Sequence, residues 1–415
     1  MKLGHARYCI SPIKKDFYLI GYKSPYRFEV ADGIHDDIYC QSLLLEVEDQ
    51  QTFIVSFDFL ELEDEMVEEI KSLVSNTFGI NQDLILLTVT HNHSSIMSYH
   101  KHWHSGEYDQ EYYDFILNTV VQSYQSCLEN KQKVVVKYGS ENVEGFYSNR
   151  NHIGNLADNQ VGVYHFINQA NQCIAGIVNW AVHSTVLSAK NNMLTGELAG
   201  NVSKKLKDYW GIQPLIIVGA AADCSNRYQR KGDDFVELER VSTELAKRIS
   251  TIEAKKELRI DKIEYQTLSH MVKTDIKKYH KEINNYLENQ LIDHPGILNK
   301  LKSQLGIEKY ELLLQFSVVH LGQLQIITFP GELGSKFGIE LKQNCLQNNS
   351  IGLISAYTNG FHYYFMPKEE YWLSFETIGN PIPEGEPEKI VEKMKQSSRL
   401  LANYYEGQYR WKMKN

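Results

Sequence analysis

The sequence of 415 residues has no run of about 18 or more apolar residues, so we expect no membrane-spanning helix. The first residues, Met1–Tyr8, carry charge and lead into no apolar stretch with a small-residue cleavage site, so they do not resemble a signal peptide. Cysteine is scarce: the six residues show no C-x-x-C spacing, and several lie in apolar segments, which indicates reduced thiols. We therefore expect a cytoplasmic protein.

Basic residues are fewer than acidic ones. The chain has 43 lysines and arginines against 52 acidic residues, a formal net charge of −9, which argues against a nucleic-acid-binding surface. The basic stretch Lys273–Lys278 is interrupted by Asp275 and is typical of a solvated helix face. We expect a small-molecule substrate rather than a nucleic acid, and the sequence leaves the oligomeric state open.

Several familiar catalytic signatures are missing. There is no G-x-S-x-G elbow, no H-E-x-x-H helix, no Walker loop and no G-x-G-x-x-G turn. The commonest serine-hydrolase, metalloprotease and nucleotide-binding motifs are thereby excluded. Polar residues at strand ends and in turns remain as the candidates for chemistry.

Two histidines directly follow a buried strand. The apolar run Leu84–Val89 predicts the strand, and His91 and His93 come after it with a spacing that points both rings to one side of an extended chain. A second apolar run ends at His183, and a third leads to Glu332. Catalytic zinc usually takes three histidine or carboxylate ligands plus a water, and this set meets that count.

Each candidate also has an ordinary structural interpretation. A histidine at the end of one strand is usually a hydrogen-bonded structural residue, and a second such histidine makes the metal and structural interpretations about equally well supported. His100, His102 and His104 lie in a loop rich in tyrosine and tryptophan, which is more typical of a pocket rim than of a metal site. Ser225 is either a nucleophile or a turn residue. Tyr364, on sequence alone, is more typical of the core than of a site.

Apolar strands alternate with amphipathic helices along the chain, which predicts an α/β fold. Short turns at 48–50 and 168–171 favour antiparallel hairpins, so we expect a mixed β-sheet core flanked by helices. We predict one large catalytic domain spanning residues 1–415, with a helical insertion at about 275–305. Helices are expected at 63–78, 110–130, 197–209, 236–252, 334–345 and 387–405.

Taken in order along nearly the whole chain, short motifs resemble the catalytic domain of the neutral ceramidase family, zinc amidohydrolases that cleave the N-acyl bond of sphingolipids. Thr88–Ser94 resembles the family's T-x-T-H-T-H-S, and Phe329–Glu332 resembles the start of its F-P-G-E-F. The other matching segments are Gly33–Asp36, Ser148–Arg150, Asn179–Thr185, Leu194–Glu197, Ala222–Asn226 and Asn359–Tyr371.

The resemblance implies one zinc ion per chain. Carried over position by position, it implies that the ligands are His91, His183, Glu332 and Tyr364. It also implies that His93 and Arg150 support the metal or contact substrate, and that Ser225 lies in the active site. In the implied reaction zinc polarises the amide carbonyl and supplies hydroxide, Tyr364 and Arg150 stabilise the oxyanion, and His93 passes a proton to the leaving amine.

Where the sequence departs from the family's motifs, the differences bear on which substrate the enzyme accepts. The segment Ser94–Tyr99 replaces a glycine-rich loop, so Ile96 and Met97 are expected to reshape the pocket mouth. The sequence runs to Asn415, and we expect the catalytic domain without the family's carboxyl-terminal β-sandwich. We predict a zinc-dependent amidohydrolase acting on a ceramide-like or other amphipathic N-acyl amide. The alternative is a cytosolic tailoring enzyme that uses the same zinc to cleave, transfer or condense an amide or ester.

Overall fold

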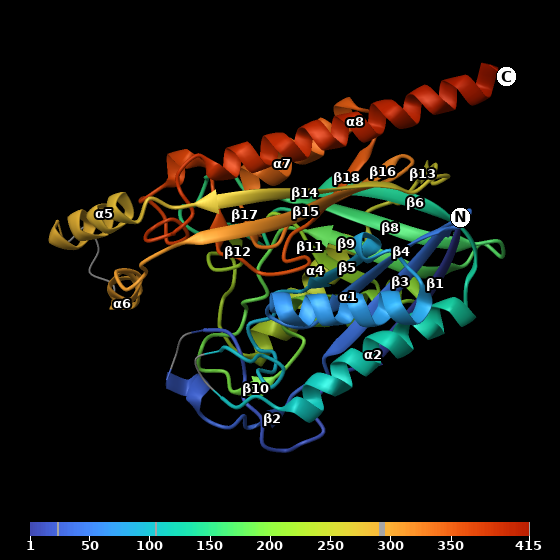
Figure 1. Cartoon of the computed structure of the whole chain (residues 1–415). Coiled ribbons are helices and arrows are strands. Elements are labelled where there is room, and N and C mark those ends of the chain that lie inside the picture. Colours follow the sequence, from blue (N-terminus) through green and yellow to red (C-terminus); the bar gives the residue numbers. More distant parts are fainter. Residues whose placement is uncertain (23–24, 104–105, 290–294, 415) are drawn as a thin grey trace.

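The computed structural model describes residues 1–22, 25–103, 106–289 and 295–414, so His104 lies outside the described residues. A large mixed sheet runs in the order β11-β9-β8-β6-β1-β3-β4-β5, with β13 paired to β6 (Figure 1). Its strands are β1 (Lys2–Cys9), β3 (Tyr39–Val47), β4 (Gln50–Phe57), β5 (Ile85–Val89), β6 (Gln132–Asn142), β8 (Gln160–Asn168), β9 (Cys173–Trp180), β11 (Leu215–Val218) and β13 (Lys256–Leu258).

A second, four-stranded sheet in the order β14-β15-β16-β18 packs against the first. Its strands are β14 (Glu264–Lys273), β15 (Glu311–Leu321), β16 (Leu324–Thr328) and β18 (Ile351–Ser355). The helices are α1 (Asp64–Phe78), α2 (Gln110–Glu129), α3 (Glu197–Trp210), α4 (Phe235–Ser250), α5 (Ile276–Glu288), α6 (Pro295–Gln304), α7 (Ser335–Gln347) and α8 (Glu386–Lys414), with 3-10 turns η1 (Pro25–Phe28), η2 (Gln82–Leu84) and η3 (Lys368–Glu370). The expected α/β class with a mixed sheet flanked by helices is confirmed, whereas a second sheet was not foreseen.

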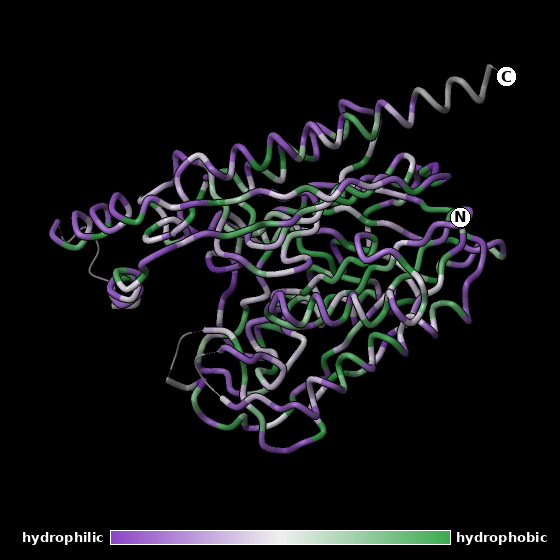
Figure 2. Tube along the Cα trace, in the orientation of Figure 1, coloured by the Kyte–Doolittle hydropathy of each residue, from purple (hydrophilic) through white to green (hydrophobic). Residues whose placement is uncertain are grey.

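Alternation of side chains along the strands explains how the sheets are buried on both faces. Leu43 and Ile54 point inward and join a cluster that includes Val319 and Ile326 of the second sheet. Leu44, one residue on, points the opposite way and packs with the helices. The helices α1 and α2 lie on one side of the molecule and α7 and α8 on the other (Figure 1). Green segments gather in the central strands in the hydropathy colouring, and α5 and the coloured part of α8 carry much purple (Figure 2).

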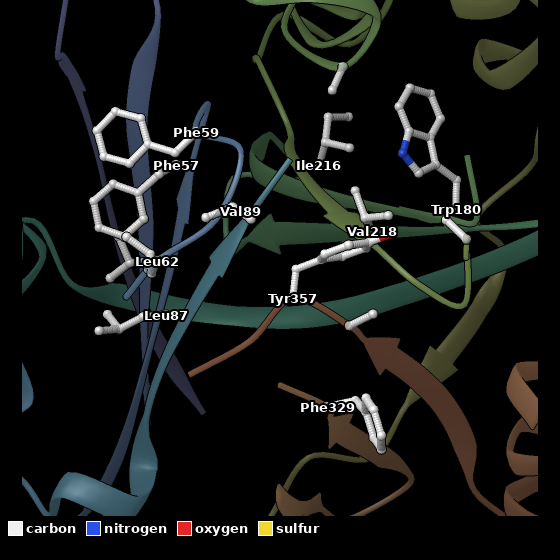
Figure 3. Packing of buried hydrophobic residues seen from close by; sticks show 14 of the residues in the cluster. Phe57, Phe59, Leu62, Leu87, Val89, Trp180, Ile216, Val218, Phe329 and Tyr357 are labelled. Atoms are coloured by element: carbon white, nitrogen blue, oxygen red, sulfur yellow. The ribbon is translucent and has the colours of Figure 1, made fainter. Parts of the chain in front are cut away.

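The carboxyl ends of several parallel strands meet at one place. β4 pairs with β5, β9 with β11, and β16 with β18, all in parallel. Backbone hydrogen bonds then join the strand ends: Ala356 N–H donates to Val218 O at 2.9 Å, and Asn359 N–H donates to Leu87 O at 2.8 Å. Figure 3 shows Tyr357 in the middle of this junction, among Val89, Val218 and Phe329 of the same apolar cluster. Parallel strand ends of this kind are where α/β proteins usually place a site.

Two-residue ladders tie distant segments to this end of the sheets. They are β2 (Gly33–Ile34) with β10 (Met193–Leu194), β7 (Ser148–Asn149) with β12 (Cys224–Ser225), and β17 (Glu332–Leu333) with β19 (Tyr364–Phe365). The last pair is parallel and sets Glu332 opposite Tyr364. Ladders this short carry no hydrophobic period, which is why the sequence did not reveal them.

The helices α5 and α6 occupy the chain between β14 and β15. They form a small apolar cluster of their own with Ile378, and the residues on the helices are Tyr279, Ile283, Tyr286, Ile297 and Leu301. None of the helices in the described parts of the chain combines the length and apolar character needed to cross a bilayer.

Candidate metal centre and active site

The two histidine-bearing segments emerge side by side from β5 and β9. An isolated parallel bridge pairs Asn92 with Ser184, and the Asn92 side-chain amide donates to Thr195 O at 2.7 Å. His91 adopts a φ of 53°, a left-handed conformation that is unusual for a non-glycine residue. The tight turn directs its ring back toward the strand ends rather than along the chain. Strain of this kind is common where a side chain must be held in a functional position.

Three imidazoles converge on one point. One ring nitrogen from each of His91, His93 and His183 lies within 4.8 Å of the others. The Glu332 carboxylate faces the same point, with Oε2 2.9 Å from His183 Nε2 and Oε1 3.8 Å from His91 Nε2. His91 and His183 are almost fully buried, and so is Glu332. The structure therefore brings together the predicted His91, His183 and Glu332, and it adds His93 as a fourth candidate ligand.

Backbone carbonyls fix which nitrogen of each ring faces inward. His91 Nδ1 lies 2.8 Å from Leu60 O, and His183 Nδ1 lies 3.1 Å from Cys224 O. A carbonyl only accepts, so both Nδ1 atoms carry the proton and both Nε2 atoms present lone pairs to the centre. Metal-bound histidines are usually held in this way by their outer nitrogen.

Burial keeps these rings neutral. Removal from water lowers the pKa of His91 to about 4, although the Glu332 charge partly opposes this. Burial, with Arg150 nearby, lowers the pKa of His183 to about 3. Burial also raises the pKa of Glu332 above its usual value, while His91 and Arg150 lower it. Two neutral imidazole nitrogens beside a carboxylate are the ligand types that a divalent cation such as zinc takes.

Arg150 adds a positive charge beside the imidazoles. Its Nη1 lies 3.4 Å from His183 Nε2, and its Nε donates to Glu376 Oε1 at 2.6 Å. Glu376 is fully buried, and Asn151 also donates to it. Burial alone would lower the pKa of Arg150, but Glu376 raises it well above the ordinary value. The ion pair therefore holds Arg150 charged at the centre.

Two tyrosines complete the carboxylate's surroundings. Tyr364 lies opposite Glu332 in the β17–β19 ladder, and its ring centroid is 5.6 Å from the Arg150 guanidinium. Burial, followed by the Glu332 charge, raises the pKa of its phenol. Tyr357 donates to Glu332 Oε2 at 3.3 Å, and its ring stacks on His91 with centroids 4.3 Å apart. The predicted site residue Tyr364 thus lies beside Glu332, while Tyr357 is an additional neighbour.

Ser225 lies close to the site but contacts none of its charged groups in the described structure. Its hydroxyl accepts a hydrogen bond from the Arg227 N–H at 3.3 Å, as a turn residue does. The preceding Cys224 carbonyl is the acceptor that fixes His183. The geometry gives Ser225 a structural contact, and a catalytic role for it stays a prediction.

The loop histidines have a separate arrangement. His100 is buried, with Nε2 2.9 Å from Glu61 Oε1 and Nδ1 3.2 Å from Glu63 Oε1. Neither of its ring nitrogens is directed to the imidazole cluster. Of the histidines that the structure describes, those grouped for metal binding are His91, His93 and His183.

Sequence reasoning missed two residues of the site. Tyr357 lies two residues after β18, just as His91 lies two residues after β5, so the strand-end rule that selected His91 also applied to it. Glu376 follows no strand, and nothing in its surroundings marked it as a partner for Arg150. Its contact spans more than two hundred positions and depends on how the segment after β19 folds back.

Comparison with known proteins agrees with this architecture. A family profile described as "Neutral/alkaline non-lysosomal ceramidase, N-terminal" matches residues 2–210. The neutral ceramidase from Pseudomonas aeruginosa is similar in structure, with a TM-score of 0.75, 14% sequence identity, and coverage of 97% of this chain and 74% of that one. A ceramidase complexed with C2 gives a TM-score of 0.74, also at 14% identity, with coverage of 97% and 75%. No curated protein matches the sequence. At such low identity the structural likeness concerns the fold.

Proposed function

Because the chain belongs to the neutral/alkaline non-lysosomal ceramidase family and is a hydrolase acting on an amide bond, we propose that it cleaves a ceramide-like or other amphipathic N-acyl amide with one bound zinc ion. The observation that carries the proposal is the convergence of two Nε2 lone pairs and a carboxylate, each fixed by buried hydrogen bonds. Mixed histidine and carboxylate ligation suits zinc among the common divalent ions. A cytoplasmic location stays a prediction.

The residues proposed to hold the ion are His91, His183, Glu332 and Tyr364. His93 is a further candidate, because one of its ring nitrogens belongs to the same group. Zinc in such a site acts as a Lewis acid on a carbonyl and makes hydroxide available near neutral pH.

The chain's own side chains are proposed to manage the charge and protons of the reaction. Arg150 has a buried Nη2 without a hydrogen-bond partner among the described residues, and this donor is available to an oxyanion. The Tyr364 phenol, beside Arg150, is proposed as a second donor to the same oxyanion. His93 Nδ1 is likewise buried without a partner, so this ring is able to carry a proton toward the leaving amine. Hydrolysis adds water across the C–N bond and yields a fatty acid and an amine.

The test is metal content by elemental analysis together with amide cleavage, on wild type, His183→Ala and His5→Ala. His5 lies on β1, outside the site, and controls for loss of an imidazole. We expect about one zinc per chain and cleavage of N-acyl substrates in wild type and the control, and loss of both in His183→Ala. A wild-type protein that binds no zinc and stays inert after zinc is added back would refute the proposal.

A further inference from the structure

Arg27 is a fully buried cation whose charge no described side chain neutralises. It lies in η1, and its exposed fraction is 0%. Its Nη2 donates to His93 O at 3.0 Å, whereas Nε and Nη1 have no hydrogen-bond partner among the described residues. These two nitrogens carry three N–H donors. Burying a charged guanidinium without acceptors for its N–H groups costs free energy. An oxyanion bound to these donors would remove that cost.

Arg27 differs from Arg150 in having no counter-charge among the described residues. Both guanidinium groups adjoin the imidazole cluster, and both are removed from water. Arg150 is neutralised by Glu376 at 2.6 Å. In the described parts of the chain no ion pair involves Arg27, although burial leaves its pKa at about 10, so that it is protonated at neutral pH. The site therefore carries one compensated and one uncompensated cation.

The segment that carries Arg27 is pressed against His93. A side chain on Gly21 would approach His93 Cα to 2.9 Å, so glycine permits the close contact. The Tyr22 ring lies 4.8 Å from the His93 ring, centroid to centroid, and the Arg27 guanidinium lies 5.5 Å from the Tyr22 ring centroid. Arg27 is thus held next to the histidine proposed to serve the leaving amine.

Other charges around Tyr22 are mostly positive. Its phenol interacts electrostatically with Arg27, Arg227 and Arg230, and with one acid, Glu197. The Glu197 carboxylate is already occupied, since it accepts from the Leu187 and Leu198 N–H groups at 2.7 and 2.5 Å. A region rich in arginine in a protein of net charge −9 favours a negatively charged ligand.

We propose that Arg27 binds an anionic group, a carboxylate or phosphate, on the amine part of the N-acyl substrate. The inference rests on the proposed amide hydrolysis and adds a substrate class to it. The anion belongs on the amine side because Arg27 adjoins His93. Once bound, the pair is shielded from water, which strengthens it. Hydrolysis of such a substrate releases a fatty acid and an amino acid or a phosphorylated amine.

The experiment compares two substrates that differ only in charge. N-lauroylserine carries a carboxylate where N-lauroylserinol, a truncated ceramide, carries a neutral CH2OH group. We expect wild type to favour N-lauroylserine by about 10- to 100-fold in kcat/KM, the range of a charge-assisted hydrogen bond. Arg27→Met is expected to bring the ratio near 1, and Arg27→Lys to restore part of it. The exposed Arg399→Gln on α8 is the matched control and keeps the wild-type ratio.

A binding measurement does not depend on turnover. Sulfonamide analogues of the two substrates, which resist hydrolysis, are titrated into wild type by calorimetry, and the serine analogue is expected to bind more tightly by a similar factor. A wild-type preference of about 1 in both assays would exclude a carboxylate as the bound anion, and a preference that survives in Arg27→Met would overturn the inference. If wild type cleaves neither compound nor any other amide, the proposed hydrolysis itself fails instead.

A second pair of substrates separates the two anions. N-lauroyl-O-phosphoethanolamine and N-lauroylethanolamine differ by a phosphate. A charge preference in the serine pair assigns Arg27 to carboxylate, one in the phosphate pair assigns it to phosphate, and a preference in neither contradicts the assignment.

Discussion

Arg150 and Glu376 form an ion pair that is closed off from solvent beside the proposed metal ligands. Glu376 is fully buried, and although burial disfavours its charge, Arg150 lowers the pKa of the carboxyl below the ordinary value. A pair of this kind contributes little net stability, but breaking it leaves an unpaired buried charge. The ion pair serves instead to hold Arg150 in position and in its charged form.

Glu376→Gln is expected to lower kcat by about 10- to 100-fold and to destabilise the fold by about 3 kcal/mol, because Arg150 loses its counter-charge. Activity assays and urea unfolding measure the two effects. Glu369→Gln removes an exposed carboxylate of the neighbouring segment and should change neither by much. The double replacement Arg150→Met with Glu376→Met should recover stability without recovering activity. Full activity in Glu376→Gln would show that Arg150 needs no fixed partner.

His320 is a buried histidine remote from the site's charges. Its exposed fraction is 0%, neither ring nitrogen has a hydrogen-bond partner in the described structure, and its ring lies 4.9 Å from that of Tyr405. Burial lowers its pKa to about 4, with Asp261 opposing and Lys262 assisting. The unfolded chain therefore binds a proton at this residue between about pH 6.5 and 4, while the folded chain does not.

The stability contributed by neutral His320 is present above about pH 6.5 and falls as the pH drops toward 4, by at most about 1.4 kcal/mol per pH unit. His320→Phe should flatten this part of the profile relative to wild type. Urea unfolding at pH 5, 6 and 7.5 measures the difference. An unchanged slope in the variant would mean that other groups account for the acid sensitivity.

At the scale of elements, the β17–β19 ladder determines the distance between Glu332 and Tyr364. Gly331 precedes β17, and a Cβ placed there would lie 2.6 Å from His362 O and 3.0 Å from Tyr363 O. Both neighbours are backbone atoms, which cannot rotate away. The ladder therefore closes only because residue 331 has no side chain.

Gly331→Ala is expected to separate the two strands and to weaken zinc binding by about 10- to 100-fold, as losses in the support of metal ligands commonly do. Competition with a chelator measures the affinity. Gly232→Ala is the control, because a Cβ there first meets an atom at 3.6 Å. Equal zinc affinity in both variants would show that the ladder adapts.

The longer elements could be predicted because their hydrophobic period is strong. All the expected helices are present, and their bounds agree within a few residues except at the end of α8, which continues from the predicted 405 to Lys414. Both predicted hairpins, β3–β4 and β8–β9, are confirmed. Strand β1 was missed, since Lys2–Cys9 contains Gly4 and several polar residues. Gly4 is required there because a Cβ would collide with Cys127 O of α2, a contact that only the fold reveals.

The site was predictable to the extent that its residues follow strands. His91, His183 and Glu332 fulfilled that rule, and the structure brings them together. Tyr364 lies in a two-residue strand without periodicity, so only the family resemblance pointed to it. Glu376 and Arg27 were not predicted from the sequence. What distinguishes them is whether a buried charge has a counter-charge, and this depends on neighbours distant in sequence.

At the scale of the whole molecule, the helix pair α5–α6 supports the segment that carries Glu376. Ile378 belongs to the apolar cluster of the pair, and Trp372 packs against it. The Tyr279 hydroxyl donates to Gly379 O at 2.9 Å. The pair thus contacts the site segment on both sides of Glu376. We propose that this predicted insertion stabilises the active site.

Ile283→Ala, at a fully buried position on α5, is expected to cost about 2–4 kcal/mol of local stability. Amide hydrogen exchange in 372–379 should accelerate, and kcat should fall with it. Lys281→Ala, at an exposed position of the same helix, should leave both unchanged. Faster exchange confined to α5 and α6 would show that the helices do not support the site.

The order in which the ladders are synthesised bears on when the enzyme can acquire its metal. Both strand-end histidines precede β11, whereas Glu332 and Tyr364 belong to the β17–β19 ladder near the other end of the chain. At a translation rate of about 5–20 residues per second, the last proposed ligand leaves the ribosome roughly 10 to 40 s after His183. During that interval the nascent polypeptide holds imidazoles but no carboxylate to complete a chelate. For the proposed zinc enzyme, the complete ligand set is therefore available only late in translation, and zinc supply rather than synthesis sets the fraction of active enzyme in a metal-starved cell.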